Sequence, residues 1–298
     1  MRWGVTAGAD YRPAPTLAWR WKRLVALARR NPAGAVSLGM ILFIALVAIL
    51  APWLAPHDPS ALGVGPRLSK PSLTYPFGTD NLGRDLLSRI IAGTRTALIV
   101  SSASVSLGVL VGTALGLVSG WFRGLVDDAL QRLIDSLMAI PPLVLAMALV
   151  AVLGPGLWKL LLALAIFLLP AAARTVRGAV LSAREEVYVE AARAIGAPTL
   201  RILLRHILPN VTAPIIIVVT VHIGAVIISE AALSFVGLGI QPPMVSWGQM
   251  LSLARPFMES APWLVAFPTG AIALTVLAFN FLGDALRDIW DPRLRGST

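Results

Sequence analysis

The sequence contains no cysteine, which excludes disulfide bonds and thiolate metal sites. Charged residues are also scarce, at 13% of the 298 residues, whereas soluble globular domains have about 25%. Because 57% of the residues are hydrophobic, the chain lacks the polar residues that a water-facing surface of this size needs. The composition therefore predicts that much of the surface faces lipid.

Charge-free stretches predict an all-α integral membrane protein with six transmembrane helices. A spanning helix needs about 20 apolar residues, since each residue rises about 1.5 Å through a hydrocarbon core of about 30 Å. The fourth span is short, so Lys159 or Arg174 must reach along it to a polar boundary, and five spans is the alternative. The predicted spans are 34–55, 96–120, 136–158, 160–174, 210–230 and 260–283.

The distribution of Lys and Arg predicts the orientation. Residues 1–33 form a basic, aromatic segment, followed by a six-span domain over 34–298 with an outer loop at 56–95 and an inner loop at 175–209. Placing both termini in the cytoplasm puts 18 of the 25 Lys and Arg residues inside and 7 outside. The net charge of +10 is then a topology signal with lipid as the partner, and no nucleic-acid surface is expected.

The inner loop predicts a helix–turn–helix. Residues 176–195 favour a helix that Gly196 can end with a positive φ, and Pro198 suits the first turn of the next helix. An exposed elbow of this kind is suited to bind a cytoplasmic partner, and the alternative is an amphipathic loop resting on lipid headgroups. The second helix is expected to have an apolar face of Leu200, Leu203, Leu204 and Ile207 and a basic face of Arg201 and Arg205.

Several of these residues resemble the EAA loop of bacterial ABC importer permeases. The resemblance rests on Glu190-Ala191-Ala192, on Gly196 and on the closing Leu208-Pro209. In that family the loop forms the coupling helix, which docks into a groove of the ATPase subunit. The resemblance implies an ATPase-coupling role for Glu190, Ala191, Ala192, Gly196, Arg201, Arg205 and Pro209.

Three further stretches resemble the dipeptide, oligopeptide and nickel permeases. They are residues 77–85, residues 229–248 and the tail from Gly283 to Pro292. The resemblance implies a type I ABC importer permease, the second of a permease pair, in the bacterial inner membrane. The outer-loop signature consists of Phe77, Gly78, Thr79, Asp80, Gly83, Arg84 and Asp85. Its spacing does not fit a calcium loop, so we expect a structural turn that caps a helix from residue 85 to residue 93.

The spans themselves contain few polar groups and one periodic glycine ridge. Gly120 continues the four-residue spacing of the ridge, which predicts either packing within the chain or a sliding contact at a gate. Ionisable residues inside spans are functional candidates, although a hydrogen-bonded neutral histidine is the simpler interpretation, and Glu230 is expected to pair with an arginine. The pathway or gate candidates are Gly108, Gly112, Gly116, His222 and Glu230.

Missing motifs limit the function further. The chain has no G-x-x-x-x-G-K-[ST] sequence, so we expect no cofactor of its own and no enzymatic activity, with ATP and Mg²⁺ held by partner ATPases. It also has no G-x-S motif, and no catalytic or metal-binding residues are predicted, because His57 and His206 stand apart. The resemblance implies a peptide permease that works with a second permease, two ATP-binding subunits and an extracytoplasmic substrate-binding protein. The alternatives are a nickel or small-solute permease of the same family, or a secondary carrier.

Overall fold

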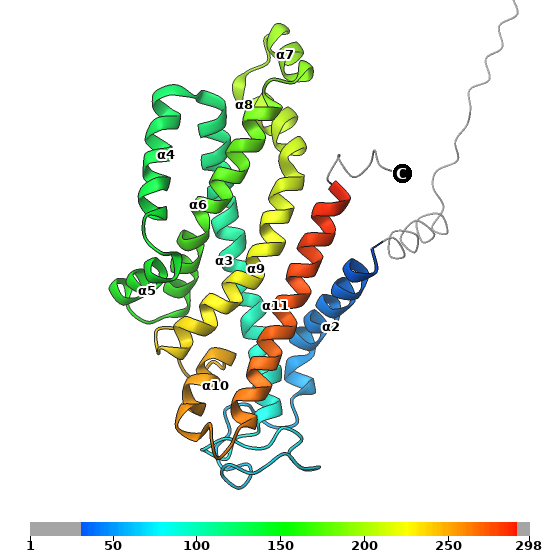
Figure 1. Ribbon diagram of the computed structural model, residues 1–298, viewed down its shortest axis with the longest axis vertical. Helices are drawn as coiled ribbons and strands as arrows, with labels where there is room; N and C mark the ends of the chain where they lie inside the picture. The colour runs from blue at the N-terminus through cyan, green and yellow to red at the C-terminus, as the bar shows by residue number, and fades with distance from the viewer. Residues whose placement is uncertain (1–30, 291–298) are drawn as a thin grey trace, which may run out of the picture.

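The computed structural model describes residues 31–290 as a bundle of helices, most of which are aligned with the long axis of the molecule (Figure 1). No strand occurs in that range beyond one isolated bridge between Thr79 and Asp85. The helices are α2 (Pro32–Leu54), α3 (Leu86–Phe122), α4 (Gly124–Met138), α5 (Pro142–Leu153), α6 (Leu157–Ala183), α7 (Val187–Ala194), α8 (Thr199–Ile202), α9 (Thr212–Phe235), α10 (Trp247–Ala254) and α11 (Trp263–Trp290).

The two ends of the bundle differ. At one end α7 and α8 project beyond the other helices, and we name this the elbow end (Figure 1). At the other end lie the segment 55–85 and α10, and we name this the loop end. Both Pro32, at the start of α2, and Trp290, at the end of α11, lie at the ends of their helices that point toward the elbow end.

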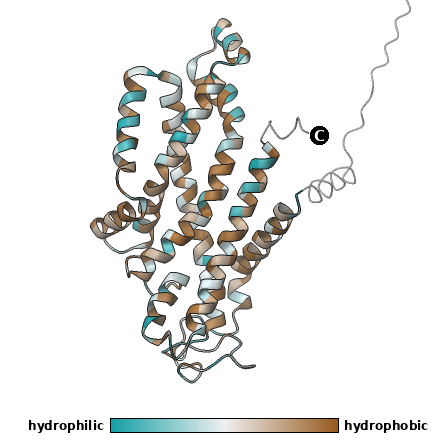
Figure 2. Ribbon diagram, viewed as in Figure 1, coloured by the Kyte–Doolittle hydropathy of each residue, from teal (hydrophilic) through white to brown (hydrophobic). Residues whose placement is uncertain are grey.

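The predicted all-α membrane fold is confirmed. Within residues 31–290, five helices are long and apolar enough to cross a membrane, and a bent pair makes a sixth if it counts as one span. Hydrophobic residues cover the long helices, while α4 and the last turns of α11 carry hydrophilic ones (Figure 2). The predicted basic segment 1–33 lies, up to residue 30, outside the described residues.

The third span differs from the single helix predicted over 136–158. The chain instead forms α4 and α5, which meet at a bend of 88°. Pro141 and Pro142 explain the break, since a residue before proline avoids the α conformation and proline suits the first helical turn. Gly154 then ends α5 with a φ of +80°. The charge-free window contained these proline residues, but hydropathy alone does not register them.

The fourth and fifth spans are longer than predicted. Helix α6 runs from Leu157 through both Lys159 and Arg174, so its length removes the difficulty of a span over 160–174. The helix is not interrupted near residue 210, where the fifth span was predicted to begin. Residues 199–235 form one continuous helical rod, with a π-helical segment over Leu203–Ile207 and a 3₁₀ segment over Leu208–Val211. Pro209 lacks an N–H donor, and the local change of helix type accommodates it.

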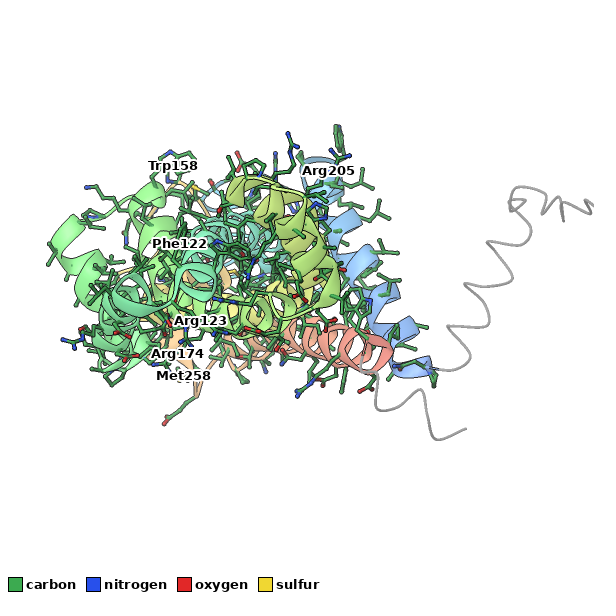
Figure 3. All side chains as sticks on the ribbon, turned by 90° about the horizontal axis from the view of Figure 1, so that it is seen from above. Phe122, Arg123, Trp158, Arg174, Arg205 and Met258 are labelled. Carbon is green, nitrogen blue, oxygen red and sulfur yellow. The ribbon has the colours of Figure 1, made fainter. Side chains whose placement is uncertain are left out.

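The glycine ridge joins α3 to α6. A Cβ added at Gly108 would lie 2.7 Å from the carbonyl oxygen of Ala165, and one at Gly112 would lie 2.7 Å from the Cβ of Ala172. Gly116 meets α6 in the same way. The packing interpretation is therefore confirmed, and a role of the ridge in gating stays a prediction. Seen along the bundle, α2 lies at one edge and the α4–α5 pair at the opposite edge (Figure 3).

Candidate functional site

The elbow is built around Gly196. Helix α6 ends at Ala183, so the helix predicted over 176–195 is interrupted by a turn before α7 begins. Gly196 has a φ of +75°, which confirms the predicted left-handed conformation. Its N–H donates to Arg193 O at 2.9 Å, and the N–H of Ala197 donates to Ala192 O at 3.1 Å. These bonds close α7 and direct the chain into α8.

The apolar face of α8 and the π-helical segment after it differs from the predicted one. Ile202, Leu203 and Ile207 are buried, but Leu200 is 66% exposed and Leu204 is 52% exposed. The buried residues pack with side chains of α6 and α7, because the rod turns this side toward the bundle. The predicted single apolar face is therefore divided: Leu203 and Ile207 face the bundle, whereas Leu200 and Leu204 face outward.

The residues that α8 leaves exposed join others at the tip of the elbow. The exposed apolar side chains there are those of Val187, Ile195, Leu200 and Leu204, and we call them the tip patch. The predicted coupling residues Glu190, Ala191, Gly196, Arg201, Arg205 and Pro209 are also exposed, while Ala192 is buried beneath them. Arg205 extends from the outside of the bundle in the view along its axis (Figure 3). The tip thus combines apolar contact surface with positive charge.

A tryptophan at the end of α3 holds the elbow, and sequence reasoning missed it. The guanidinium of Arg193, on α7, lies 4.5 Å from the centre of the Trp121 ring, and that of Arg184 lies 5.9 Å from it. Arg184 Nη1 also donates to Trp121 O at 2.8 Å. Arg123 Nη2 pairs with Glu185 Oε1 at 2.7 Å beside them. Burial lowers the pKa of Arg184, and the positive charge of Arg123 lowers it further.

At the loop end, the outer-loop signature folds into a turn that starts α3. Asp85 accepts a hydrogen bond from Ser88 N at 3.1 Å, which confirms the predicted cap, although α3 continues far beyond residue 93. Asp80 Oδ1 accepts from the N–H groups of Leu82 and Arg84 at 2.8 and 3.0 Å. Gly83 takes a φ of +70°, as the tight turn requires.

Glu230 lies in a hydroxyl network. It is buried in α9 and its Oε1 accepts a hydrogen bond from Ser234 Oγ at 2.6 Å. Ser246 Oγ donates to Ser234 Oγ at 3.3 Å, which connects α9 to the start of α10. The predicted arginine partner is wrong, since within residues 31–290 no arginine forms an ion pair with this carboxyl.

His222 lies near the middle of α9. Its Nδ1 donates to Val218 O at 2.8 Å, so its hydrogen bond is to its own helix. The side chain lines a cavity of about 530 Å³ with Thr175, Arg287 and Trp290. Within residues 31–290 no group of three or more histidine, aspartate or glutamate side chains that could hold a metal ion occurs.

Two models of known protein families together match most of the chain. Residues 112–296 match the family described as binding-protein-dependent transport system inner membrane component. Residues 20–71 match the N-terminal TM domain of oligopeptide transport permease C.

Individual relatives and a solved structure agree with these family matches. The glutathione transport system permease protein GsiD of Pectobacterium atrosepticum is 45% identical over 280 residues, which cover 93% of this chain and 92% of that protein. The dipeptide transport system permease protein DppC of Alkalihalophilus pseudofirmus is 42% identical over 275 residues, covering 92% and 90%. A chain of the MetNI methionine ABC transporter, in inward-facing conformations, matches with a TM-score of 0.57 over 68% of this chain and 97% of that chain. Because the two chains are only 19% identical in sequence, this match shows a similar fold and nothing more.

Proposed function

The chain belongs to the family of binding-protein-dependent transport system inner membrane components, the permease subunits of ABC importers, and from this premise we propose that it imports peptides. It forms half of the translocation pathway. The names of its relatives support this substrate class, since they are glutathione and dipeptide transport permeases. Those names do not favour the nickel alternative.

The elbow couples this pathway to the ATPase subunits. The observation that carries this proposal is the tip patch, which projects beyond the bundle around Gly196. Exposed apolar side chains at an aqueous end of a membrane protein indicate a protein contact, and a short amphipathic helix fits a groove in a partner. Arg201 and Arg205 beside the patch favour a partner groove with acidic residues.

The elbow end faces the cytoplasm, and both termini lie on that side. The excess of Lys and Arg in the segments of the elbow end supports this orientation. The loop end then faces outward, where a substrate-binding protein delivers the solute. A second permease completes the pathway, and two ATP-binding subunits hold ATP and Mg²⁺.

Reconstitution tests this proposal. The purified chain alone should show no ATP hydrolysis, whereas proteoliposomes holding the complete complex should take up peptides only with ATP and the binding protein. ATP hydrolysis by the single chain would contradict the division of labour. Uptake of Ni²⁺ without uptake of any peptide would replace the substrate class and leave the permease assignment in place.

A further inference from the structure

A cavity of about 540 Å³ opens at the loop end, between the segment 55–85, the start of α3 and the region from the end of α9 through α10. Its lining includes two arginines and five neutral hydrogen-bonding side chains. They are Arg84, Arg89, Ser60, Ser234, Ser252, Gln241 and Gln249. None of the residues that line it carries a carboxylate, so its walls are positive.

Of the two arginines in the wall of this cavity, Arg84 is half-buried and Arg89 is buried. The side chain of Arg84 is 12% exposed and that of Arg89 is 3% exposed. One carboxylate lies behind them, with Asp80 Oδ2 at 2.5 Å from Arg84 Nε and 3.8 Å from Arg89 Nε. Two guanidinium groups thus share one counter-charge, which leaves a net positive charge at the cavity.

Asp80 contacts only part of the Arg84 guanidinium. Asp80 orders the turn through two backbone N–H groups and holds only the Nε atom of the guanidinium. Arg84 Nη2 is buried and has no hydrogen-bond partner among residues 31–290. A buried donor without a partner is uncommon in folded proteins. Guanidinium groups bind carboxylates through paired N–H donors, so two arginines in the wall of one cavity favour a carboxylate ligand.

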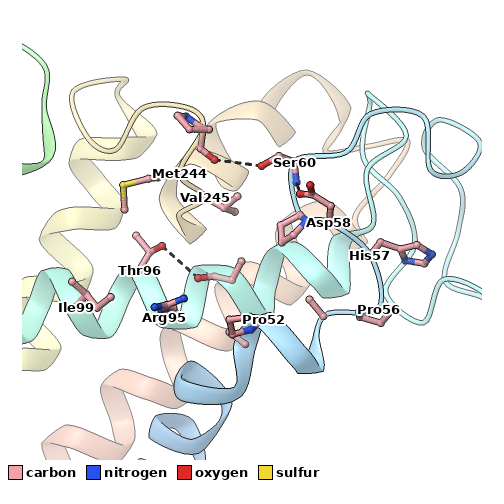
Figure 4. A pocket seen from close by; sticks show the side chains of 15 residues that line it. Pro52, Pro56, His57, Asp58, Ser60, Arg95, Thr96, Ile99, Met244 and Val245 are labelled. Carbon is pink, nitrogen blue, oxygen red and sulfur yellow. Dashed lines mark hydrogen bonds between the residues drawn. The ribbon is translucent and has the colours of Figure 1, made fainter.

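We propose that this cavity binds the free carboxylate of the transported peptide at the entrance of the pathway. The inference rests on the proposed peptide import. The volume is that of a small-molecule pocket, since such pockets hold roughly 300–1,000 Å³. It neighbours a second cavity of about 610 Å³, because Ser60, Pro243, Met244 and Val245 line both. Ser60 Oγ donates to Pro243 O at 3.5 Å at this boundary, and the second cavity offers space for the rest of the peptide (Figure 4).

The test compares peptides with and without a C-terminal charge. The complete complex, in proteoliposomes, receives a defined mixture of di- to pentapeptides and the same mixture as C-terminal amides, and mass spectrometry measures uptake of each. The wild-type ratio of acid to amide uptake is compared with that of Gln249→Glu, which adds a carboxylate to the cavity without touching Asp80. Arg84→Lys keeps the charge but removes the fork. Leu73→Glu is the matched control, because Leu73 is fully exposed at the loop end and lines neither cavity.

Using a ratio cancels any preference of the binding protein, because that protein is the same in every sample. We expect the acid-to-amide ratio to fall about tenfold in Gln249→Glu and severalfold in Arg84→Lys, as loss of a charge-assisted hydrogen bond predicts. Leu73→Glu should keep the wild-type ratio. Unchanged ratios in both cavity variants, at normal membrane abundance, would overturn the inference. An equal fall for acids and amides in Gln249→Glu would also overturn it, and would assign the cavity to docking of the binding protein. Absence of all peptide uptake by the wild type would instead refute the proposed function, and the inference with it.

Discussion

Replacing Gly196 with valine tests the elbow at the residue that shapes it. The φ of +75° is strained for any residue with a Cβ, and more so for a β-branched one. A Cβ added at this position meets no atom within 4 Å, so no steric clash contributes. The whole effect therefore comes from the backbone, and the left-handed conformation costs about 1–2 kcal/mol.

This cost is small beside the stability of a folded domain, which is about 5–15 kcal/mol. Gly196→Val should therefore insert and fold near normally, and the free elbow relaxes by moving α8 relative to α7. Binding of an ATPase that requires the native elbow must restore the strained conformation. The affinity should then fall about 5- to 30-fold, which is what 1–2 kcal/mol represents. Peptide uptake falls with it.

Membrane abundance, ATPase co-purification and uptake are measured in parallel. Gly63→Val is the matched control, since Gly63 has a φ of +65° and also meets no atom within 4 Å, but lies at the loop end. It should show the same backbone strain with ATPase binding intact. Glu190→Ala should weaken ATPase binding less than Gly196→Val, because it removes one exposed charged side chain without bending the chain. Normal uptake by Gly196→Val, with its ATPases attached at wild-type affinity, would refute the coupling assignment.

Single cysteines introduced into this cysteine-free chain report its orientation in the membrane. A cysteine that replaces Lys70 should react with an impermeant maleimide from outside, and one that replaces Glu185 should react only after the inner face is opened. The reverse pattern of labelling would overturn the topology. Gly112→Ala should lower the melting temperature in detergent by overpacking the α3–α6 contact, at a cost of about 1–3 kcal/mol, whereas Gly270→Ala, whose Cβ meets nothing within 4 Å, should not lower it. Trp121→Ala should reduce the amount of peptide taken up per ATP hydrolysed while the ATPases stay bound, because it removes the ring that the guanidiniums of Arg184 and Arg193 contact. An unchanged amount of peptide per ATP would show that the ring has no role in coupling.

Features set by local chemistry could be predicted from the sequence. Hydropathy located the long helices because a membrane helix satisfies its own backbone hydrogen bonds and must be apolar over about 20 residues. Gly196 and Asp85 were identified because a positive φ and a helix cap each depend on one residue and its neighbours. The four-residue glycine spacing on α3 likewise indicated a close helix contact.

Features set by packing could not be predicted in the same way. The exposed side of α8 depends on how the continuous rod of residues 199–235 is rotated against α6, and a helical period fits more than one rotation. The partners of Glu230 come from Ser234 and the start of α10, which is folded back onto α9. The bend at Pro141 was readable from the sequence, but the charge-free window gave proline no weight.

Helix α3 joins the two proposed sites physically. Its 37 residues form one unbroken helix of about 55 Å, at about 1.5 Å per residue. At the elbow end, Trp121 is contacted by the guanidiniums of Arg184 and Arg193. At the loop end, its first residues adjoin the turn that holds Arg84, and Arg89 in its first turn lines the cavity. Energetic coupling between distant sites needs a rigid element that both sites can bias. Because the glycine ridge holds α3 against α6, we expect a movement of the elbow to shift α3 and α6 together and to change the shape of the loop-end cavity, whose wall includes Arg89.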